Sequence, residues 1–340
     1  MSSKMSGVFK NKIILITGGT GSFGKTFARY LVENENPKKV IILSRDEFKQ
    51  HLMKMEFAKQ ESLMRYFLGD VRDLDRLQRA FHGVDIVVHA AALKQVPAVE
   101  YDPFEGVKTN ILGSQNVITA CIDQGVEKAL LVSSDKAAEP VNLYGATKMC
   151  AEKLFVASNI YSPHGTKFSA VRYGNFVLSR GSITETLLRD THDNVSITHE
   201  EMTRFWMTFD GSHQLVRYAL TEMEGGEVFV PKIPSMKITD LFKALAPKAK
   251  HKVGGLRAGE RIHEILLTEE ESMRSFDVGK YFVILPHKTI APKQAKHYEK
   301  YAKIGKATKH GFRYRSDTNE DWLAPEDLKK VLKLEVTKHS

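Results

Sequence analysis

Tyr144 and Lys148 are the pair whose types and spacing most directly suggest chemistry. Their spacing of four residues places both side chains on one face of a helix, about one turn apart. A nearby positive charge stabilises a phenolate, and a tyrosine in that state can remove the proton of a sugar or alcohol hydroxyl during hydride transfer. In a lysine-rich chain with 11 tyrosines one such pair is expected by chance, so the interpretation depends on the neighbouring residues.

Asp135 and Lys136 provide a second acid–base candidate. They directly follow Ser133 and Ser134, which lie at the end of a predicted strand. The hydroxyls of these two serines could contact the same substrate oxygen as Tyr144. Ligands of doubly wound sheets bind at the carboxyl ends of the strands. Asp135 and Lys136 are therefore either a surface ion pair or a second catalytic pair. The second interpretation predicts elimination next to a ketone formed in the site.

A glycine-rich segment, residues 17–24, joins the first predicted strand to the first predicted helix. Glycines let the backbone turn tightly and approach a pyrophosphate, whose charge is met by N–H groups at the helix start. The position between a strand and a helix makes dinucleotide binding the favoured interpretation over a plain glycine-rich turn. The residues assigned to the pyrophosphate are Gly18, Thr20, Gly21, Ser22, Phe23 and Gly24.

The end of the second predicted strand, Ser44 and Arg45, decides which dinucleotide is expected. An acidic residue here accepts hydrogen bonds from a ribose 2′-hydroxyl, whereas an arginine beside a hydroxyl fits a 2′-phosphate. The sequence therefore favours NADP over NAD, although Asp46 follows directly and is either a ribose ligand or a helix N-cap. The other predicted cofactor contacts are Lys49, Asp70, Val71, Ala90, Ala91, Tyr144 and Lys148.

Continuous apolar segments alternate with helical segments through the first half of the chain. Strands that are apolar on both faces indicate a parallel sheet covered by helices on both sides. The predicted strands are 12–17, 40–44, 66–68, 85–89, 129–133 and 168–172. The predicted helices are 23–33, 46–60, 74–81, 104–124 and 144–159. The predicted fold class is therefore α/β, with a doubly wound parallel sheet of the Rossmann type.

The alternation fails after about Gly174, where short helices, loops and one further predicted strand over 228–230 follow. We predict a dinucleotide-binding Rossmann domain over 1–176, with a return segment near 206–231. Residues 177–340 are expected to form mainly a smaller α/β substrate-binding domain and a C-terminal extension. This smaller domain is expected to close over the first.

The composition excludes several classes of protein. The 340 residues are 42% hydrophobic and 27% charged, with a mean hydropathy of −0.29, and they lack the apolar run of about 18 residues that a membrane span requires. The N-terminal segment has no apolar stretch typical of a secretory signal, so we expect a cytoplasmic protein without a membrane partner. Cys121 and Cys150 lack metal-ligand spacing, so no metal site is predicted and both are expected in the core.

The formal net charge of +9 favours anionic partners. Basic segments over 288–309 and 329–338 are expected to be solvated helix faces. Because the chain has no nucleic-acid-binding motif and no basic patch interleaved with aromatic residues, no nucleic-acid partner is predicted.

The Ser–Tyr–Lys set resembles the catalytic constellation of the short-chain dehydrogenase/reductase (SDR) superfamily. Nearly the whole chain resembles one extended branch of it, the inverting UDP-N-acetylglucosamine 4,6-dehydratases, soluble enzymes that begin pseudaminic acid synthesis in bacteria. Membrane-anchored, configuration-retaining relatives typically have methionine where this chain has Tyr144. The segments that carry the resemblance are 44–50, 90–94, 134–148, 171–175, 180–182, 202–206, 230–236, 257–260 and 263–264.

The resemblance implies a redox-neutral lyase reaction on a UDP-sugar, with NADP as a recycled cofactor. Tyr144, supported by Lys148, would deprotonate the 4-hydroxyl of the sugar. Lys136 would then remove the C5 proton while Asp135, beside Ser134, protonates the departing 6-hydroxyl. A lysine base must be neutral, which requires a lowered pKa. Homo-oligomers, as dimers that assemble into a hexamer, are also implied.

The same resemblance implies further contacts with the substrate. They are Arg180, Arg204 and Arg257 to the diphosphate, Lys94 and Asn175 to the sugar, Glu260 to the uridine ribose and Tyr314 to another part of the nucleotide. The sequence departs from the family pattern at Gln95, Leu178 and residues 183–187. These departures lie near the expected sugar site.

Two alternative functions remain open. A UDP-hexose 4-epimerase shares the fold, the glycine-rich loop and the pair Tyr144 and Lys148, but it would not need Asp135 and Lys136. A catalytically silent NADP-binding protein of the same fold would need neither pair.

Overall fold

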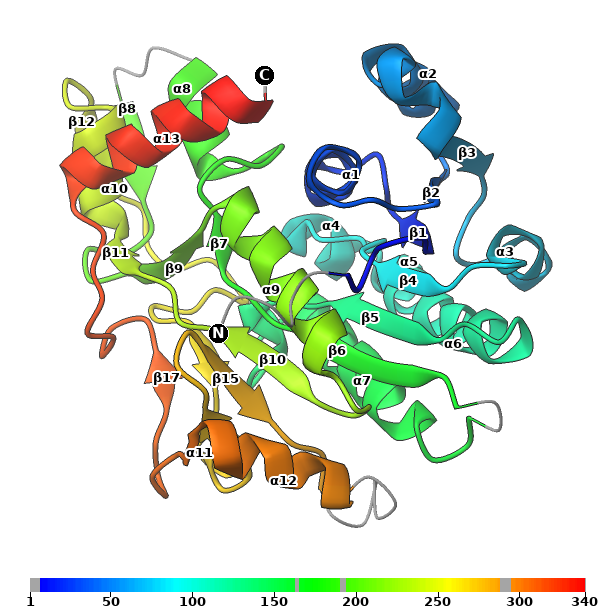
Figure 1. Cartoon of the computed structure of the whole chain (residues 1–340). Coiled ribbons are helices and arrows are strands. Elements are labelled where there is room, and N and C mark those ends of the chain that lie inside the picture. The colour runs from blue at the N-terminus through cyan, green and yellow to red at the C-terminus, as the bar shows by residue number, and fades with distance from the viewer. Residues whose placement is uncertain (1–6, 163–164, 190–193, 288–294, 340) are drawn as a thin grey trace.

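The computed structural model describes residues 7–162, 165–189, 194–287 and 295–339. It is built around a ten-stranded sheet with the order β16-β14-β15-β10-β6-β5-β4-β1-β2-β3 (Figure 1). Strands β3 to β10 in this order pair in parallel, and β15, β14 and β16 are added antiparallel. The strands are β1 (Ile13–Thr17), β2 (Lys39–Ser44), β3 (Met64–Leu68), β4 (Ile86–His89), β5 (Lys128–Val132), β6 (Lys167–Val171), β10 (Val228–Pro231), β14 (Ser275–Asp277), β15 (Tyr281–Ile284) and β16 (Lys306–Ala307).

Helices cover both faces of this sheet, which is why its central strands are apolar on both sides. The side chains of residues 14–16 in β1 and 87–88 in β4 are fully buried. Helices α1 (Ser22–Asn34) and α9 (Phe209–Glu222) pack together on one face, and α3 (Leu74–Phe81), α6 (Gly113–Asp123) and α7 (Leu143–Ser158) lie on the other (Figure 1). The predicted doubly wound α/β fold class is confirmed. The strand order reverses between β1 and β4, where such sheets bind ligands.

Two predicted helices are divided in the structure. The segment predicted over 46–60 is α2 (Glu47–Glu56) followed by the 3-10 helix η1 (Ala58–Leu63). The segment predicted over 104–124 is α5 (Pro103–Gly106), the π-helical turn η2 (Val107–Leu112) and α6. Such π turns are frequent at functional sites. Here the turn carries Asn110, whose side chain accepts from the backbone N of Leu93 at 2.8 Å and donates to its carbonyl at 2.9 Å.

A smaller layer of short strands and helices follows β6. Its strands and helices are β7 (Asn175–Phe176), α8 (Ile183–Arg189), β8 (Asn194–Ile197), β9 (Thr203–Met207), β11 (Ser235–Lys237), α10 (Ile238–Leu245), β12 (Lys250–Val253), β13 (Ile265–Leu267), β17 (Tyr314–Arg315) and α13 (Pro325–His339). The prediction of one strand after Gly174 was wrong. These strands are two (β7) to five (β9) residues long, too short to show a periodic pattern in the sequence.

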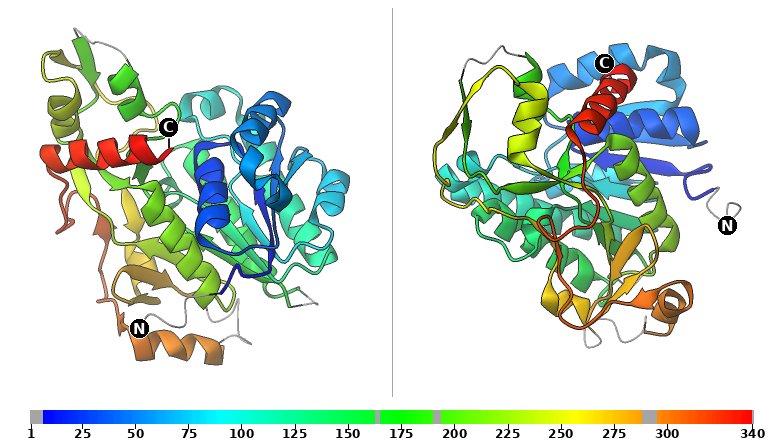
Figure 2. Two further views of the ribbon diagram at one scale, coloured as in Figure 1. Left: turned by 45° about the horizontal axis from the view of Figure 1, so that its top comes forward. Right: turned by 90° about the vertical axis from the view of Figure 1, so that its left-hand side faces the viewer.

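The smaller layer has its own apolar core. Trp206, Leu241, Phe242 and Leu328 are among its buried side chains. The C-terminal helix α13, red in Figure 2, packs on α10 in this layer. The boundary predicted at residue 176 stays a prediction. Strands β10, β14, β15 and β16 come from beyond this residue and complete the large sheet. The remaining helices are α4 (Val96–Tyr101), η3 (Asp135–Ala137), α11 (Glu269–Ser272) and α12 (Ala295–Ile304).

Within the described ranges, no helix is long and apolar enough to cross a membrane. No group of three or more His, Cys, Asp or Glu side chains in the same ranges could hold a metal ion. Cys121 is buried in the core, whereas Cys150 is half-buried. Of the basic segment 288–309, residues 295–304 form α12, and residues 288–294 lie outside the described residues.

Candidate functional site

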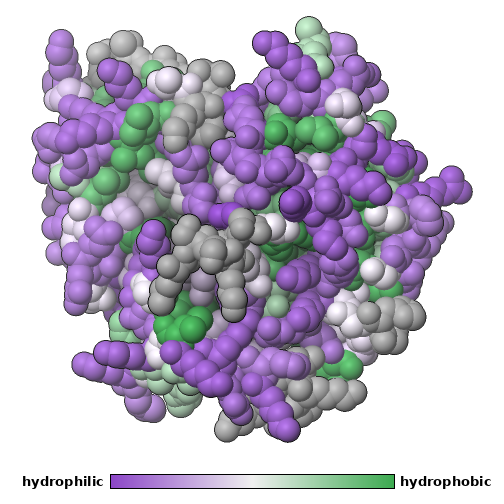
Figure 3. Space-filling view, in the orientation of Figure 1, coloured by the Kyte–Doolittle hydropathy of each residue, from purple (hydrophilic) through white to green (hydrophobic). Residues whose placement is uncertain are grey.

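A cavity of about 1120 Å³ lies at the carboxyl ends of the parallel strands, between the large sheet and the smaller layer. The space-filling view shows a notch between these two parts at the upper edge of the molecule, on a mainly hydrophilic face (Figure 3). Asp135 and Tyr314 do not line the cavity. The predicted site residues that line it are Gly18, Thr20, Gly21, Ser22, Phe23, Gly24, Ser44, Arg45, Asp46, Lys49, Asp70, Val71, Ala90, Ala91, Lys94, Ser134, Lys136, Tyr144, Lys148, Asn175, Arg180, Arg204, Arg257 and Glu260.

The glycine-rich loop is packed too closely for larger residues. Gly18 has a φ of +65°, and a Cβ there would lie 2.8 Å from the Cα of Ala91. A Cβ at Gly24 would lie 2.6 Å from the Cα of Gly19, so α1 could not pack this close to the loop. Gly21 precedes α1 and offers no side-chain cap to it. The N–H groups of its first turn can therefore bind an anion, which fits the pyrophosphate of a dinucleotide.

The Asp46 carboxylate is the N-cap of α2. Its Oδ1 accepts from the backbone N of Lys49 at 2.9 Å, and its Oδ2 lies 2.5 Å from the Lys49 Nζ. These hydrogen bonds hold the pKa of Asp46 below its usual value. The Ser44 hydroxyl, at the end of β2, accepts from Nε2 of Gln50 at 3.1 Å. Of the two roles that the sequence allowed for Asp46, the structure thus shows the helix cap.

Arg45, the cation predicted to meet a 2′-phosphate, lines the cavity. Its side chain is half exposed, and its guanidinium lies 3.6 Å from the Asp70 carboxylate. Arg72 donates to the same carboxylate through Nε at 3.0 Å and through its backbone N at 3.0 Å. Although partial burial acts in the opposite direction, the hydrogen bonds from Arg72 keep the pKa of Asp70 below its usual value. Arg45 is therefore held loosely and can turn to an anionic ligand.

A buried hydrogen-bond chain, which was not predicted from the sequence, fixes the backbone beyond β4. The Thr17 hydroxyl lies 2.6 Å from the His89 Nδ1 and accepts from the backbone N of Ala91 at 3.2 Å. The second ring nitrogen of His89 lies 3.1 Å from the Ser114 hydroxyl. Burial, with a smaller effect of Lys148, lowers the pKa of His89 to about 3. The ring is thus neutral and positions Ala91 beside the cavity.

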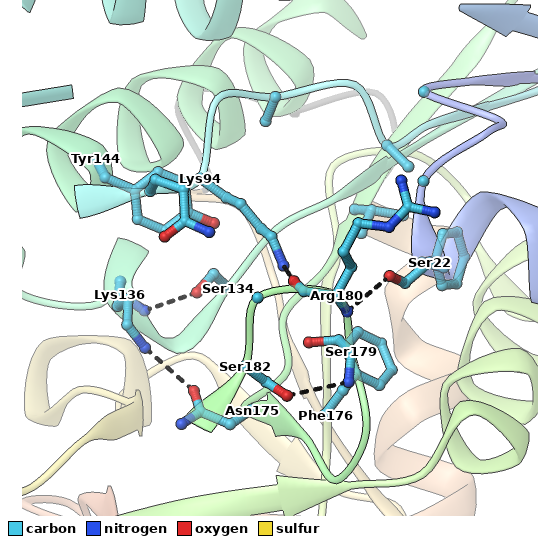
Figure 4. Close-up of a pocket in the computed structure, with 18 of the residues that line it drawn as sticks. Ser22, Lys94, Ser134, Lys136, Tyr144, Asn175, Phe176, Ser179, Arg180 and Ser182 are labelled. Carbon is cyan, nitrogen blue, oxygen red and sulfur yellow. Dashed lines mark hydrogen bonds between the residues drawn. The ribbon is translucent and has the colours of Figure 1, made fainter. Parts of the chain in front are cut away.

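Lys94 and Ser22 both contact the loop that contains Arg180. The Lys94 Nζ donates to the carbonyl of Arg180 at 3.1 Å, and the backbone N of Arg180 donates to the Ser22 hydroxyl at 3.1 Å (Figure 4). Burial lowers the pKa of Lys94, with Glu185 acting against it. The loop therefore joins the glycine-rich segment to the part of the cavity predicted to hold the sugar.

Tyr144 and Lys148 lie on α7, as predicted, with both side chains buried. The Lys148 Nζ donates to the carbonyl of Val132 at 2.8 Å, and burial lowers its pKa to about 8. Burial raises the pKa of Tyr144, although Lys136 and a hydrogen bond with Ser134 act in the opposite direction. Tyr144 therefore needs further positive charge in the cavity before it can act as a phenolate base.

Ser134, Asp135 and Lys136 form one hydrogen-bonded group at the start of η3. The Ser134 hydroxyl donates to Oδ1 of Asp135 at 2.8 Å, and the Lys136 Nζ lies 3.0 Å from the same oxygen. The Lys136 Nζ also donates to Oδ1 of Asn175 at 3.4 Å, and Asn175 belongs to β7 in the smaller layer (Figure 4). Asp135 is 1% exposed, and burial raises the pKa of its carboxyl. Asp135 thus reaches the cavity through the lining residues Ser134 and Lys136.

Lys136 has a second carboxylate partner that was not predicted from the sequence. Oε1 of Glu264 lies 3.3 Å from the Lys136 Nζ and 3.5 Å from Nε of Arg204. Although burial acts in the opposite direction, Asp135 and Glu264 raise the pKa of Lys136 above its usual value. The lowered pKa that a lysine base requires is thus not found in this state. Residues 263–264 carry part of the family resemblance, which is the available sequence signal for this contact.

The predicted substrate residues are held in different ways. Arg204 donates to the carbonyls of Thr203 and Arg261 at 2.8 and 3.0 Å, so much of its guanidinium is already bonded to backbone. Arg257 and Glu260 lie in one turn, where the backbone N of Arg257 donates to Oε2 of Glu260 at 3.2 Å. Trp206, two residues after Arg204 on β9, lines the same cavity. Alternation along a strand could have predicted it.

Tyr314 lies in the apolar core instead of the cavity. Its hydroxyl donates to the carbonyl of Ile233 at 2.9 Å and accepts from the backbone N of the same residue at 2.9 Å. Its ring packs against Phe205, with 4.8 Å between ring centroids. Both ends of the side chain are therefore engaged in the fold, and a direct nucleotide contact by Tyr314 is not part of this site.

Comparison with known proteins gives a consistent result. Residues 14–286 match the family described as "Polysaccharide biosynthesis protein". The chain is 47% identical to the UDP-N-acetylglucosamine 4,6-dehydratase (inverting) of Campylobacter jejuni over 96% of this chain and 98% of that protein. It is 40% identical to the UDP-glucose 4-epimerase of Rickettsia typhi over 82% of this chain and 84% of that protein.

Solved structures share the fold. The crystal structure of Pen from Bacillus thuringiensis has a TM-score of 0.86 and 34% identity, over 96% of this chain and 100% of that chain. The dTDP-glucose 4,6-dehydratase DesIV from Streptomyces venezuelae, solved with NAD and TYD bound, has a TM-score of 0.64 and 20% identity. That match covers 74% of this chain and 86% of DesIV.

Proposed function

The chain belongs to this family of polysaccharide biosynthesis proteins, and we propose that it is an NADP-dependent, inverting UDP-N-acetylglucosamine 4,6-dehydratase, a lyase. The product would be UDP-2-acetamido-2,6-dideoxy-β-L-arabino-hex-4-ulose. The reaction would be the first step of a pseudaminic acid-type synthesis. The similarity to an inverting dehydratase over nearly the full length of both chains supports the reaction type.

The observation that carries this proposal is the presence of two acid–base pairs at one cavity. Tyr144 and Lys148 are sufficient for an oxidation at a sugar hydroxyl. Asp135 and Lys136, hydrogen-bonded at 3.0 Å, add the acid and the base that a dehydration needs. The interpretation of Asp135 and Lys136 as a plain surface ion pair is disfavoured, because Asp135 is buried and Lys136 lines the cavity.

The residues of this chain divide the proton transfers between them. Tyr144, supported by Lys148, takes the proton of the 4-hydroxyl, and the ketone formed at C4 acidifies the C5–H bond. Lys136 then takes the C5 proton. Asp135 gives its proton to the departing 6-hydroxyl through Ser134, which contacts both Asp135 and the cavity, and water leaves. The lysine must be neutral at the moment it acts, which follows when its proton lies on Asp135.

The cavity fits a dinucleotide, because the crowded glycines and the uncapped start of α1 leave a backbone surface for a pyrophosphate. When bound, the dinucleotide supplies hydride exchange with C4 and C6 of the sugar. The residues proposed to hold it are Gly18, Thr20, Gly21, Ser22, Phe23, Gly24, Ser44, Arg45, Lys49, Asp70, Val71, Ala90, Ala91, Tyr144 and Lys148. NADP is proposed over NAD because Arg45 is available to a 2′-phosphate while Asp46 is engaged as the cap of α2.

The remaining cavity residues are proposed to bind the UDP-sugar. Arg180 and Arg257 are exposed at its rim and would contact the diphosphate, whereas Arg204 is buried and largely bonded to backbone. The residues proposed for the sugar and the uridine ribose are Lys94, Asn175 and Glu260.

We also propose that the protein acts in the cytoplasm as a homo-oligomer. The resemblance to the soluble branch of the family supports this assignment. Tyr101 and Phe104, on α4 and α5, are 86% and 61% exposed, and such apolar side chains are often covered by a second subunit. Analytical ultracentrifugation of the purified protein tests the assembly, and a monomer at working concentration would contradict it.

The reaction is tested by proton NMR of the protein with UDP-N-acetylglucosamine and a catalytic amount of NADP in heavy water. The expected result is a new C6 methyl signal, deuterium at C5 and couplings of the L-arabino configuration. A methyl product with the original C5 configuration would contradict inversion. No change to the sugar would contradict the dehydratase and favour a catalytically silent protein.

A UDP-hexose 4-epimerase is the second candidate, favoured by 40% identity to the Rickettsia typhi epimerase. It needs Tyr144 and Lys148 but leaves no task for Asp135 and Lys136. In the same NMR experiment, conversion to the galacto isomer without a methyl signal would identify it.

A further inference from the structure

Glu264 is a buried carboxylate beside Lys136 to which the proposed reaction gives no role. Its side chain is in contact with Lys136 at 3.3 Å and with Arg204 at 3.5 Å, both through Oε1. Within the described part of the chain, Oε2 has no hydrogen-bond partner. Ser316 fixes the backbone of Glu264, accepting from its N and donating to its carbonyl, both at 2.9 Å. A buried charge is unfavourable unless it is compensated, so its place beside the catalytic lysine calls for an explanation.

We propose that Glu264 is a positioning residue of the elimination step, holding the Lys136 amine beside Asp135 and keeping one proton on the Asp135–Lys136 pair. The inference rests on the proposed function, because an elimination is the reaction that uses this pair. Glu264 acts through Lys136 and does not line the cavity itself.

The Asp135–Lys136 pair works with one shared proton. When the proton moves from the Lys136 Nζ to Oδ1 of Asp135, across 3.0 Å, the pair becomes a neutral amine and a carboxylic acid without exchange with solvent. In the elimination the C5–H bond breaks and an N–H bond forms on Lys136. The C–H electron pair forms the C5–C6 double bond, and the C6–O bond breaks as the Asp135 proton leaves with the hydroxyl as water. Lys136 then holds the single proton as an ammonium.

The surroundings of the pair decide whether that proton is kept. Arg204 on β9 disfavours the proton on Lys136, whereas Glu264, just before β13, favours it. Glu264 is itself anionic, because Lys136 and Arg204 keep its pKa below the usual value despite burial. The charged and titratable groups that face Lys136 or Glu264 are Asp135 and Lys136 on η3, Tyr144 on α7, Arg204 on β9, Arg261 and Glu264.

The variant Glu264→Gln tests the charge while keeping the shape of the side chain. Without the negative charge of Glu264, the Asp135–Lys136 pair binds protons less tightly. The pH below which the pair takes up a second proton is therefore lower, and so is the pH above which it loses its single proton. Both limits of the pH profile of elimination are therefore expected to move to lower pH by about one unit or more. The C4 oxidation depends on Tyr144 and Lys148, and its pH profile is expected to move less, because Glu264 acts on Tyr144 only through Lys136.

The experiment compares wild type and variants with UDP-N-acetylglucosamine and NADP across pH. NMR of the methyl product measures elimination, and nicotinamide absorbance in a single turnover measures C4 oxidation. Glu264→Asp keeps the charge but shortens the side chain, so its pH limits should stay while elimination slows about tenfold. Glu271→Gln is the matched control, because Glu271 is a carboxylate with a side chain only 12% exposed that pairs with an arginine, Arg172, outside the cavity. It should lower thermal stability without moving the pH limits.

The outcomes separate this inference from the function on which it rests. A folded Glu264→Gln protein whose limits stay or move to higher pH overturns the inference, as does an equal loss of both partial reactions. If Glu264→Gln does not fold, a Glu264→Asp protein that eliminates at the wild-type rate, or that slows both partial reactions alike, overturns it too. If the wild type itself forms no methyl product, the proposed function fails and the inference fails with it.

Discussion

The Nζ of Lys136 lies 3.0 Å from Oδ1 of Asp135, the residue that precedes it in the chain. The base and the acid proposed for the elimination are thus hydrogen-bonded to each other within one turn of 3-10 helix. The Ser134 hydroxyl donates to the same oxygen at 2.8 Å and, unlike Asp135, lines the cavity. A proton can therefore pass between base, acid and substrate along three consecutive residues.

Replacing Lys136 by methionine should separate elimination from oxidation. The substitution keeps an unbranched side chain but removes the base, so formation of the C6 methyl product should fall by at least about 100-fold. Tyr144 and Lys148 remain, and nicotinamide absorbance should still report C4 oxidation in a single turnover. Asp135→Asn should show the same division, because it removes the acid that protonates the 6-hydroxyl.

Lys153→Met is the matched control for the Lys136 variant. Lys153 is an exposed lysine of α7, the helix that carries Tyr144, and it lies outside the cavity. The substitution makes the same chemical change and removes the same charge, so both partial reactions should stay unchanged. Formation of the methyl product by Lys136→Met at the wild-type rate would contradict the assignment of the base.

Lys148 should make the stability of the protein without cofactor depend on pH. Its pKa is about 8 in the folded state and 10.5 in the unfolded reference. Between these values the unfolded chain binds more protons than the folded one, so the Lys148 contribution to stability rises with pH and is smallest below pH 8. Thermal unfolding of wild type and Lys148→Met across this range should show that the wild type gains stability relative to the variant. Parallel curves for the two proteins would contradict a lowered pKa of the buried Lys148 ammonium.

The large sheet could be predicted because its strands carry their own signal. Ile14 to Ile16 and Val87 to Val88 are apolar without alternation, as strands covered on both faces must be. Because parallel strands end at one edge of a sheet, residues that follow each strand meet there. Ser44, Asp70, Ala91 and Ser134 were found on this basis and line the cavity.

The contacts made by the second half of the chain could not be predicted in the same way. Glu264, which contacts Lys136, directly precedes β13, and this strand of three residues is too short to reveal its partner in the sequence. The depth of Asp135 and the position of Tyr314 in the core depend on the same tertiary packing. The family resemblance drew attention to Asp135, Glu264 and Tyr314, but it did not show which atoms each of them contacts.

Arg45→Ala should weaken binding of NADP more than binding of NAD. The guanidinium is proposed to bind the 2′-phosphate, and a hydrogen bond to a charged group contributes enough that its loss weakens binding about tenfold to hundredfold. Titration calorimetry with both dinucleotides measures the difference. Arg65→Ala is the control, because Arg65 on β3 is exposed and lies outside the cavity. Equal weakening of both dinucleotides by Arg45→Ala would show that Arg45 does not distinguish them.

Gly145→Ala should displace Lys136, the proposed base, through the backbone of η3. A Cβ at Gly145 would lie 2.2 Å from the carbonyl oxygen of Lys136, so α7 and η3 would have to move apart. Such overpacking destabilises a protein by about 1–3 kcal/mol, more than the helix propensity gained by alanine. Elimination should be impaired more than dinucleotide binding, because the shift moves Lys136 relative to Tyr144.

Gly211→Ala in α9 is the matched control for this substitution. Gly211, like Gly145, is the third residue of its helix and donates its backbone N to the N-cap side chain, here Thr208 at 3.0 Å. The nearest atom to a Cβ there would be the Thr208 hydroxyl oxygen at 3.2 Å, and Thr208 does not line the cavity. Suppose that the two variants have the same midpoint of thermal unfolding and that Gly145→Ala forms the methyl product at the wild-type rate. The close approach of α7 to η3 would then have no part in positioning Lys136.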